Sequence, residues 1–356
     1  MKIIKHILTL LNWLAALLLV LSTLAGVVRP SRCYWLSLLS YAYFPLLLTN
    51  AALAVLWLCL SRREFLISFV AIVVRWSFVP LFFQVGGASA APGPEANTIK
   101  VMSFNMHHFY GRNYVSQKDC MGNQDSNAVT FLGMLRDEAP DVLCLQEFLP
   151  YTANMDVRDS MKAMGYEYYA AAAPRYGHSA SIFWSKYPIV NTLCIDSVRK
   201  VQADIVKQGD TIRIFSFHLS SFQLTEDNLE EIDKISRGEV EDMIPRSTLG
   251  KFKANILAHD SEWVELKPYI ENSPYPCIVA GDFNDTPASY IYQQMAKTLK
   301  DTYKERGKGF CTTYHGRFPA FRIDYILHSS DFKALSYKRL KSDMSDHYPI
   351  LAELEL

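Results

Sequence analysis

A short apolar segment in the last third of the chain is followed by polar side chains that suit an anionic ligand. Residues 276–280 are apolar, Gly281 ends the segment, and Asp282, Asn284 and Asp285 follow. A strand that ends in such residues places them at the rim of a sheet, where ligands tend to bind. Asp282 can accept a proton or hold a metal-bound water, and Asn284 can donate two hydrogen bonds to an anion. The pair suits a phosphate ester, although the same residue types also form an ordinary Asx-turn.

Other predicted strands of this region also carry polar residues at or near their ends. Strands are predicted over residues 98–106, 141–148, 177–188, 190–195, 211–219, 276–280, 322–328, 332–339 and 345–354, and helices over 123–138, 225–272 and 289–300. The polar residues are Asn105, Glu147, His218, Asp282 with Asn284, Asp324, and Asp346 with His347. One such ending is common, but six in one domain are what an active site at a sheet edge requires.

This set of side chains is rich in oxygen and lacks cysteine, which favours Mg²⁺, or Mn²⁺, over zinc. Hydrolysis of a phosphate ester needs a metal, an oriented water, donors to the phosphate oxygens and help for the leaving group. Glu147 and Asp346 are expected to bind the metal, and Asp282 is expected to activate the water. Asn105 and Asn284 are expected to contact the phosphate. Asp324 is expected to orient His347, and His218 to contact the transition state. Each residue alone is explained equally well by a structural role, whereas the whole set favours catalysis.

Residues 98–356 resemble the endonuclease/exonuclease/phosphatase superfamily, which has the deoxyribonuclease I-like fold. The motifs stand in the family's order: SFNM with Asn105, DVLCLQEF with Glu147, SIFWSKYPI, FSFHL with His218, VAGDFNDTP with Asp282 and Asn284, FRIDYIL with Asp324, and SDHYPI with Asp346 and His347. The resemblance implies a four-layer α/β sandwich with a Mg²⁺-dependent site.

The resemblance also implies roles for single residues. Glu147 is the implied metal ligand, and Asn105 and Asp346 lie close to the metal. The resemblance further implies that Asp282 and Asn284 contact water and phosphate and that Asp324 pairs with His347. It does not identify the general base. Family members often have a further phosphate-contacting residue between the Glu and His motifs, for which the candidates are Arg175, Tyr176 and His178.

Charge is distributed unevenly along the chain. Residues 1–90 hold seven Lys or Arg and one acidic residue, which leaves 29 of the 36 basic and 35 of the 36 acidic residues in 91–356, a net charge of −6. A region this acidic is poorly suited to non-specific binding of nucleic acid, and it attracts divalent cations.

Residues 1–85 predict three transmembrane helices. Ile7–Val28 and Tyr34–Ser61 carry no charged residue, and Phe65–Val85 carries only Arg75. Each covers the roughly 20 residues needed to cross a bilayer, and Arg75 is expected to face other helices, water or headgroups. The first segment is too long for the core of a cleaved signal peptide, which is its alternative interpretation.

Positive charge predicts the orientation. Lys2, Lys5, Arg62 and Arg63 outnumber Arg29 and Arg32, so the N-terminus is expected inside and residues after 90 outside the cytoplasm. Residues 86–97 are rich in Gly, Ala and Pro and predict a linker before a catalytic domain at 98–356. This arrangement, with membrane spans ahead of the catalytic domain, resembles that of bacterial members of the superfamily. The resemblance implies a multi-pass protein of the bacterial inner membrane.

The leading hypothesis is a membrane-anchored, metal-dependent hydrolase of phosphate esters. Its substrate is expected to be a lipid headgroup, a nucleotide or nucleic acid, and no obligate protein partner is expected. The anchor favours a lipid, and Phe318, Ala320 and Phe321 hint at an apolar loop. The alternative is a catalytically silent domain that binds a phosphate ligand on a membrane stalk; loss of a metal- or water-handling residue would favour it, and none is missing. A third possibility gives the first ninety residues a function of their own, with Arg75 as a lipid or partner contact.

The orientation can be tested with a reporter enzyme fused after residue 90. We expect activity from a reporter that works only outside the cytoplasm, because three crossings bring this point to the far side of the membrane. Activity only from a cytoplasmic reporter would contradict the predicted topology.

Overall fold

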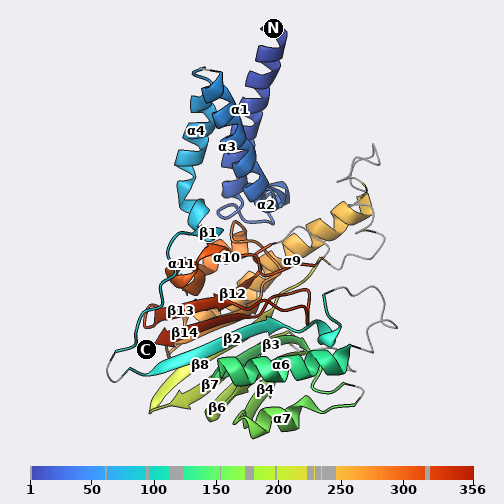
Figure 1. Cartoon of the computed structure of the whole chain (residues 1–356), viewed down its shortest axis with the longest axis vertical. Coiled ribbons are helices and arrows are strands. Elements are labelled where there is room, and N and C mark those ends of the chain that lie inside the picture. The colour runs from blue at the N-terminus through green and yellow to red at the C-terminus, as the bar shows by residue number, and fades with distance from the viewer. Residues whose placement is uncertain are drawn as a thin grey trace. The chain divides into compact units, whose positions relative to one another are not determined.

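The computed structural model of the chain forms two compact units, which are described separately (Figure 1). Unit 1 comprises residues 1–83, 222–263 and 285–295, and unit 2 comprises residues 84–221, 264–284 and 296–356. The structure describes residues 2–60, 62–93, 96–112, 123–152, 154–172, 180–196, 199–222, 228, 234, 246–316 and 321–356. The predicted division at residues 85 and 98 stays a prediction.

Unit 2 is built on two six-stranded sheets. The strands are β2 (Thr98–Asn105), β3 (Val142–Phe148), β4 (Tyr168–Ala171), β5 (Ala180–Ser185), β6 (Ile189–Cys194), β7 (Lys200–Lys207), β8 (Asp210–His218), β9 (Cys277–Asp282), β10 (Lys300–Asp301), β12 (Asp324–His328), β13 (Lys333–Arg339) and β14 (Ile350–Glu355). One sheet has the order β10-β12-β9-β8-β7-β6 and the other β13-β14-β2-β3-β5-β4. Each sheet contains one parallel pair, β8 with β9 and β2 with β3.

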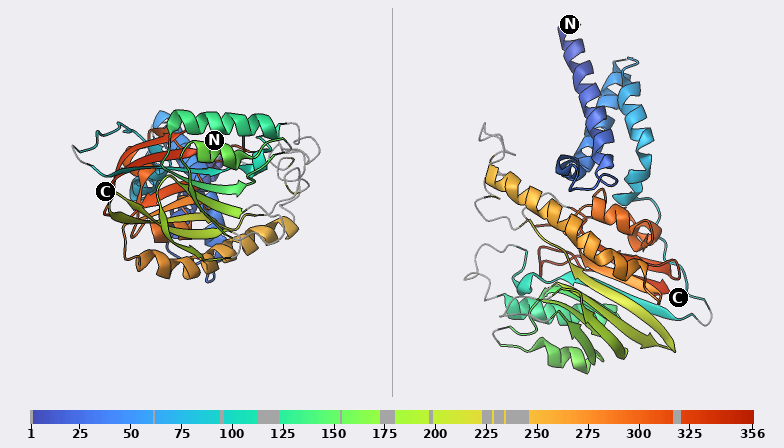
Figure 2. Two further views of the ribbon diagram at one scale, coloured as in Figure 1. Left: turned by 90° about the horizontal axis from the view of Figure 1, so that it is seen from below. Right: turned by 180° about the vertical axis from the view of Figure 1, so that it is seen from behind.

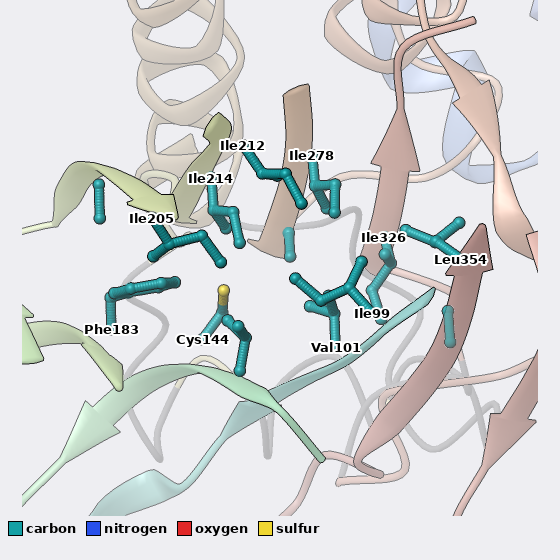
Figure 3. Packing of buried hydrophobic residues seen from close by; sticks show 14 of the residues in the cluster. Ile99, Val101, Cys144, Phe183, Ile205, Ile212, Ile214, Ile278, Ile326 and Leu354 are labelled. Carbon is teal, nitrogen blue, oxygen red and sulfur yellow. The ribbon is translucent and has the colours of Figure 1, made fainter. Parts of the chain in front are cut away.

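The main core lies between the two sheets (Figure 3). Every second residue of a strand points inward, as the period of a strand dictates. Ile99 and Val101 of β2 therefore face Ile212 and Ile214 of β8 across the core. Fully burying an aliphatic side chain of this size contributes about 1.5–3 kcal/mol. This shared core holds the two sheets together face to face.

Helices cover the outer faces of both sheets. On one side lie α6 (Gln124–Glu138) and α7 (Val157–Ala163), whose residues Phe131 and Met161 share a second core with Phe104 of β2 (Figure 2). On the other side lies the C-terminal part of α9 (Arg246–Glu271), where Glu265 pairs with Lys200 of β7 at 3.0 Å and Leu266 is buried. The layers are therefore helix, sheet, sheet and helix, which confirms the predicted four-layer α/β sandwich.

Most predicted elements are present with small shifts of their ends. The elements of unit 2 that were not predicted are α7, β4 and β7, together with the short η2 (His107–Phe109), β10, α11 (Thr302–Arg306) and β11 (Gly309–Phe310). The predicted helical region 225–272 contains α9, and the predicted helix 289–300 is the shorter α10 (Tyr290–Met295). A further short strand is β1 (Phe83–Gln84).

The N-terminal part of unit 1 consists of apolar helices. They are α1 (Lys2–Leu24), α2 (Tyr34–Tyr41), α3 (Tyr43–Cys59), α4 (Phe65–Val74) and the 3₁₀ helix η1 (Trp76–Leu81). Among the described residues, α1 is the one helix long and apolar enough to cross a membrane, and α2 with α3 passes the same test as a pair bent by 64°. The predicted third span is a 10-residue helix followed by η1, which contains Pro80.

These helices expose many large apolar side chains and bury several polar ones. Most of the exposed large apolar side chains of the described chain lie before residue 86. Polar side chains form hydrogen bonds between the helices: Asn50 Nδ2 donates to the Ala15 carbonyl at 3.0 Å, and Ser68 Oγ donates to Asn12 Oδ1. Larger side chains are buried there as well, among them Leu19, Tyr43 and Trp57. Small residues and hydrogen-bonding side chains at helix contacts are typical of helices that pack in lipid.

The loop between α1 and α2 binds to later segments of unit 1. Arg29 Nε donates to both carboxylate oxygens of the buried Asp260 in α9, at 2.8 and 3.0 Å. The Ser31 amide donates to the same carboxylate, and Gln294 Nε2 of α10 donates to the Gly26 carbonyl at 3.1 Å. Residues 26–31 and the segments around 260 and 294 therefore meet at one end of the helices.

Gly281 in β9 is expected to tolerate no side chain. Its φ is +150°, and a Cβ atom there would overlap the Phe217 carbonyl group of β8. We expect Gly281→Ala to lower the free energy of unfolding by about 3 kcal/mol or more, through strain and overpacking. Thermal unfolding of the full chain in detergent measures this loss.

Gly133 provides the matched control, because it lies inside α6 with no atom near the position of a Cβ. Gly133→Ala is expected to raise stability by about 0.5–1 kcal/mol, since alanine is the better helix former. Equal effects of the two substitutions would contradict this account of Gly281.

Candidate active site

Strand topology brings the predicted residues of unit 2 to one edge of the sheets. In the parallel pair β8 and β9, His218 lies beside Asp282. In the antiparallel pair β9 and β12, Asp282 lies beside Asp324. In the parallel pair β2 and β3, Asn105 lies beside Gln146, one residue before Glu147. Four strands, β2, β3, β8 and β9, therefore end at the same edge, and β12 begins there.

Asp282 lies at the centre of these contacts. Its Oδ1 accepts a hydrogen bond from the Asn284 amide at 2.8 Å, so the Asx-turn is present together with the site. Its Oδ2 accepts from Asn105 Nδ2 at 3.0 Å and lies 3.7 Å from His218 Nε2 and 3.8 Å from His347 Nε2. One carboxylate thus makes the turn with one oxygen and faces three site residues with the other.

Asn284 adopts a left-handed backbone conformation, with φ of +50°. Its side-chain Nδ2 donates to the Leu219 carbonyl at 3.1 Å, just beyond the end of β8. Left-handed backbone is tolerated by asparagine better than by most residues. The turn therefore holds the Asn284 side chain beside the ends of β8 and β9.

Glu147 is aimed by a bulge in β3. The pairing of β3 with β5 shifts register between Leu145 and Phe148, and Glu147 has φ of +48°. A bulge bends a strand and redirects a side chain. Glu147 Oε1 accepts from Asn105 Nδ2 at 3.3 Å and lies 3.6 Å from His218 Nε2. The bulge thus turns Glu147 toward Asn105 and His218.

His347 and Asp324 form the predicted pair. His347 Nδ1 lies 3.0 Å from Asp324 Oδ2, and both side chains are buried. The Ser345 hydroxyl accepts from the His347 amide and donates to the Asn105 carbonyl at 2.7 Å. The Tyr314 and His347 rings pack edge to face, with their centroids 5.1 Å apart. These contacts hold the His347 ring in one orientation with Nε2 toward Asp282.

Burial and like charge raise the pKa of Asp282 to about 6. Burial is the largest cause and the Asp324 carboxylate adds to it, while His347, His218 and the Asn105 hydrogen bond act in the opposite direction. Burial alone would lower the pKa of His347, but the Asp324 and Asp282 carboxylates raise it well above its ordinary value. A positive His347 between two carboxylates is therefore the favoured state.

The pKa of Glu147 is shifted in the opposite direction, below its ordinary value. Burial would raise the pKa of its carboxyl, but His218, His107, His108 and the Asn105 amide together lower it. Glu147 is therefore ionised across the neutral pH range and can act as a cation ligand.

Two histidines at the site, His107 and His108, were not predicted. They follow Asn105 after one intervening residue, Met106, and two adjacent histidines close behind a strand-end asparagine were the signal available in the sequence. His107 Nδ1 lies 3.3 Å from Asp346 Oδ1, and His108 Nε2 lies 3.5 Å from Glu147 Oε2. Both carboxylates that were predicted to bind metal therefore have an imidazole beside them.

The group of described side chains whose ligand atoms lie close together differs from the predicted metal ligands. Among the described residues, Asp282, Asp324 and His347 bring one ligand atom each within 4.8 Å of one another. The predicted ligands Glu147 and Asp346 lie at the rim, with 24% and 20% of their side chains exposed. The third predicted ligand, Asn105, directs its Nδ2 toward Glu147, and its Oδ1 accepts from the His107 amide.

Three further residues that were singled out from the strand ends contact Asp282: Asn105, His218 and Asn284. Glu147 contacts Asn105 and His218, and Asp346 lies beside His107. The candidates for a further phosphate contact, Arg175, Tyr176 and His178, lie outside the described residues, as do Phe318 and Ala320.

Comparisons with known proteins bear on both parts of the chain. Residues 102–347 match a family model described as the Endonuclease/Exonuclease/phosphatase family, and residues 5–82 match one described as a domain of unknown function. No curated protein matches the chain.

Solved structures resemble this chain over most of its length. An endonuclease/exonuclease/phosphatase from Bacteroides vulgatus is 18% identical with a TM-score of 0.50, covering 73% of this chain and 99% of that one. A family protein from Bacteroides thetaiotaomicron is 17% identical with a TM-score of 0.49, covering 74% and 96%. A mannosyl-6-phosphatase from the same species is 18% identical with a TM-score of 0.48, covering 72% and 99%. At this identity the first of these likenesses shows the fold alone.

The raised pKa of Asp282 predicts a pH-dependent effect of Asp282→Asn on stability. The Asp282 carboxyl ionises near pH 3.8 in the unfolded chain but only near about pH 6 in the folded chain. Above about pH 6 its ionisation therefore lowers the stability of the folded state. The stability contributed by the protonated form is lost as pH rises between these values. With chelator present, Asp282→Asn is expected to match the unaltered chain near about pH 4 and to exceed it by about 1–3 kcal/mol near about pH 8.

Asp204→Asn is the control for this experiment. Asp204 is also buried, but its hydrogen bonds to Arg213 and Asn191 outweigh burial and lower its pKa. Its substitution is expected to reduce stability near about pH 8, the opposite sign. Thermal unfolding at both pH values compares the two variants, and a shared sign would contradict the assignment for Asp282.

Proposed function

Because the chain belongs to the endonuclease/exonuclease/phosphatase family, we propose that it is a membrane-anchored, divalent-cation-dependent hydrolase of phosphate esters. The observation that carries the proposal is the convergence of Asp282, Asp324 and His347 with His218 and Asn105, within hydrogen-bond or near-contact distance. A sheet edge with only a structural role does not require two buried carboxylates and two histidines side by side, whereas an active site does.

Asp282 is proposed to position the attacking water. Asn105 and Asn284 fix both carboxylate oxygens of Asp282, so its orientation is set before substrate binds. Above its pKa of about 6, the ionised carboxylate can accept the proton of a water. The Asp324–His347 pair faces the same oxygen, and a positive His347 can donate a hydrogen bond from Nε2 to a phosphate oxygen.

His218 and Asn284 are proposed to donate to the phosphate. His218 Nε2 is buried without a hydrogen-bond partner and lies 3.6–3.7 Å from Glu147 and Asp282. An unpaired buried N–H has a cost, which a phosphate oxygen would remove. The Asn284 amide group carries two hydrogens, of which one serves Leu219 and one is left for a phosphate oxygen.

Glu147 and Asp346 are the proposed cation ligands, with Asn105 beside them. A hydrated cation such as Mg²⁺ keeps several waters, and this suits the partly exposed Glu147 and Asp346 better than the fully buried Asp282 and Asp324. Asp324 Oδ2 is also engaged by His347. A bound Mg²⁺ or Mn²⁺ would supply positive charge to offset the charge on the phosphoryl oxygens.

The N-terminal helices are proposed to anchor the protein in a membrane by three crossings. Their apolar outer surface and small or polar contacts suit lipid better than water. Lys5 Nζ pairs with Glu64 at 2.7 Å, so the turn after α3 lies at the N-terminal end of α1. The Arg29–Asp260 pair lies beyond the C-terminal end of α1.

These two contacts support the proposed orientation. If α1 crosses the membrane, Arg29 and its partner Asp260 lie on the side opposite Lys5. Positive charge at Lys2, Lys5, Arg62 and Arg63 favours the cytoplasm for the N-terminal end. Asp260 then lies outside the cytoplasm, as expected for a bacterial inner-membrane enzyme with an extracytoplasmic catalytic part.

A lipid headgroup is the favoured substrate class. Contact between residues 26–31 and the segments around 260 and 294 holds part of the post-membrane chain beside the proposed bilayer surface. The acidic composition of residues 91–356 argues against a long nucleic acid as substrate.

The proposal is tested with the full chain in detergent. Hydrolysis of a generic phosphodiester, a phosphomonoester, single- and double-stranded DNA, and phospholipid or sphingolipid vesicles is measured with Mg²⁺, with Mn²⁺ and with chelator. We expect cation-dependent turnover that falls by at least about 100-fold in Glu147→Ala and His347→Ala, since each removes a group from the reaction centre.

Glu353→Gln on β14 is the control, because Glu353 lies on the strand that leads away from His347. It is expected to retain activity. Absence of turnover on every substrate, with phosphate ligands still bound, would favour the silent binding domain instead.

A further inference from the structure

The turn between α3 and α4 borders a basic hollow at the N-terminal end of α1. The hollow has a volume of about 560 Å³, which falls within the range of about 300–1,000 Å³ that is usual for ligand sites. Its lining residues are Lys5, Arg62, Arg63, Glu64 and Ile67. Lys5 Nζ pairs with Glu64 at 2.7 Å, and Asn12 Nδ2 donates to the Glu64 carbonyl at 2.8 Å. These two contacts join α1 to the turn.

Positive charge in this hollow exceeds negative charge. Glu64 is the one acidic residue of residues 1–90, and Lys5 pairs with it. Arg62 and Arg63 are exposed, and neither forms an ion pair within the part of the chain that the structure describes. Three basic side chains and one carboxylate give the lining a net charge of +2. The hollow therefore attracts an anion.

A second hollow shares Lys5 and Glu64 with the first. It has a volume of about 370 Å³, and its lining residues are Lys5, His6, Thr9, Leu10, Trp13 and Glu64. The α1 residues of this set are spaced so that they lie on one face of the helix. Leu10 and Trp13 are 70% and 60% exposed. Because a helix rises about 1.5 Å per residue, this face runs roughly 12 Å from the charged Lys5 to the apolar Trp13.

The two hollows together match the polarity of a phospholipid. The polar layer of one leaflet is about 5–8 Å thick, and hydrocarbon lies below it. A surface that changes from basic to apolar over roughly 12 Å therefore spans the headgroup layer and the start of the hydrocarbon. Tryptophan is enriched at this boundary. A soluble anion would contact only the basic end and leave Leu10 and Trp13 uncovered, whereas a lipid covers both ends.

We propose that the two hollows bind an anionic phospholipid of the cytoplasmic leaflet. Its phosphate lies against Arg62 and Arg63, and an acyl chain lies along Leu10 and Trp13. Basic pockets on the cytoplasmic side of membrane helices bind anionic headgroups in this way. The inference rests on the proposed membrane anchor and its orientation. Since Arg29 lies beyond the opposite end of α1, the bound lipid belongs to the other leaflet from the proposed lipid substrate.

Quenching of tryptophan fluorescence by brominated lipids tests the inference with the full chain in vesicles. The vesicles consist of phosphatidylcholine with a minor share of phosphatidylglycerol. Bromine is carried either by the phosphatidylglycerol or by an equal amount of phosphatidylcholine, so both membranes have the same charge. Chelator is present, so that cation-dependent hydrolysis does not consume the lipid. We expect stronger quenching by brominated phosphatidylglycerol, and we expect Trp13→Phe to remove this preference, since Trp13 is the reporter among the six tryptophans.

Arg62→Gln and Arg63→Gln are each expected to reduce the preference for phosphatidylglycerol roughly fivefold, the effect of one basic side chain at an anionic surface. Both variants keep the backbone hydrogen bonds of the turn, from the Arg62 amide to the Trp57 carbonyl and from the Leu66 amide to the Arg63 carbonyl. Arg32→Gln is the control, because Arg32 is also exposed but follows the C-terminal end of α1. It is expected to keep the preference.

The outcomes separate this inference from the proposed function. Equal quenching by the two brominated lipids, or a preference that persists in Trp13→Phe, would overturn the inference. Loss of the preference in Arg32→Gln to the same extent as in Arg62→Gln would also overturn it. Turnover of a phosphate ester without lipid preference would leave the proposed hydrolase standing, and lipid preference without any turnover would leave only the inference standing. Absence of quenching by either lipid would overturn the membrane anchor and the inference together.

Discussion

Two carboxylates buried side by side, Asp282 and Asp324, impose the main physical constraint on this site. The antiparallel register of β9 and β12 places them opposite one another in a region closed to solvent. Two buried carboxyl groups whose oxygen atoms lie within 4.8 Å of one another cannot both ionise without a compensating positive group. His347 supplies that group, since its ring contacts Asp324 at 3.0 Å and faces Asp282 at 3.8 Å. The Asp282 pKa near 6 and the raised pKa of His347 follow from this one arrangement.

The outer part of the site is organised around backbone strain. Glu147, Asn284 and the turn at His107 to Phe109 all have positive φ. Bulges and left-handed turns redirect side chains that a regular strand would point into the core or away from the site. The energy for these conformations comes from the paired sheets and from the α6 hydrogen bonds. Gln124 and Asn127 therefore help to position the site residues through hydrogen bonds to the carbonyls of His108 and Phe109.

The two units differ in the side chains that they expose. Unit 2 has a core of aliphatic and aromatic residues between its sheets, as expected for a protein in water. The N-terminal helices of unit 1 bury alanine, serine and asparagine together with a few large side chains such as Tyr43 and Trp57, and they expose many large apolar side chains. In water such helices would expose their apolar surface at a cost, whereas in lipid the same surface is solvated. This contrast is the structural basis for proposing a membrane anchor.

The sequence by itself determined the fold class and most strands. It also singled out residues that the structure brings together, because strands that end in acidic, amide or imidazole groups place those groups at a sheet edge. Asn105, Glu147, His218, Asp282, Asp324 and His347 were all found this way. Only the tertiary structure decided what depends on register and backbone conformation. The sequence does not show that Asp324 lies opposite Asp282, or that a bulge aims Glu147. Nor does it show that a left-handed turn brings His107 and His108 to the carboxylates, because that turn is held by residues of α6 that are distant in sequence. The elements α7, β4 and β7 were missed because packing, more than local pattern, stabilises short elements.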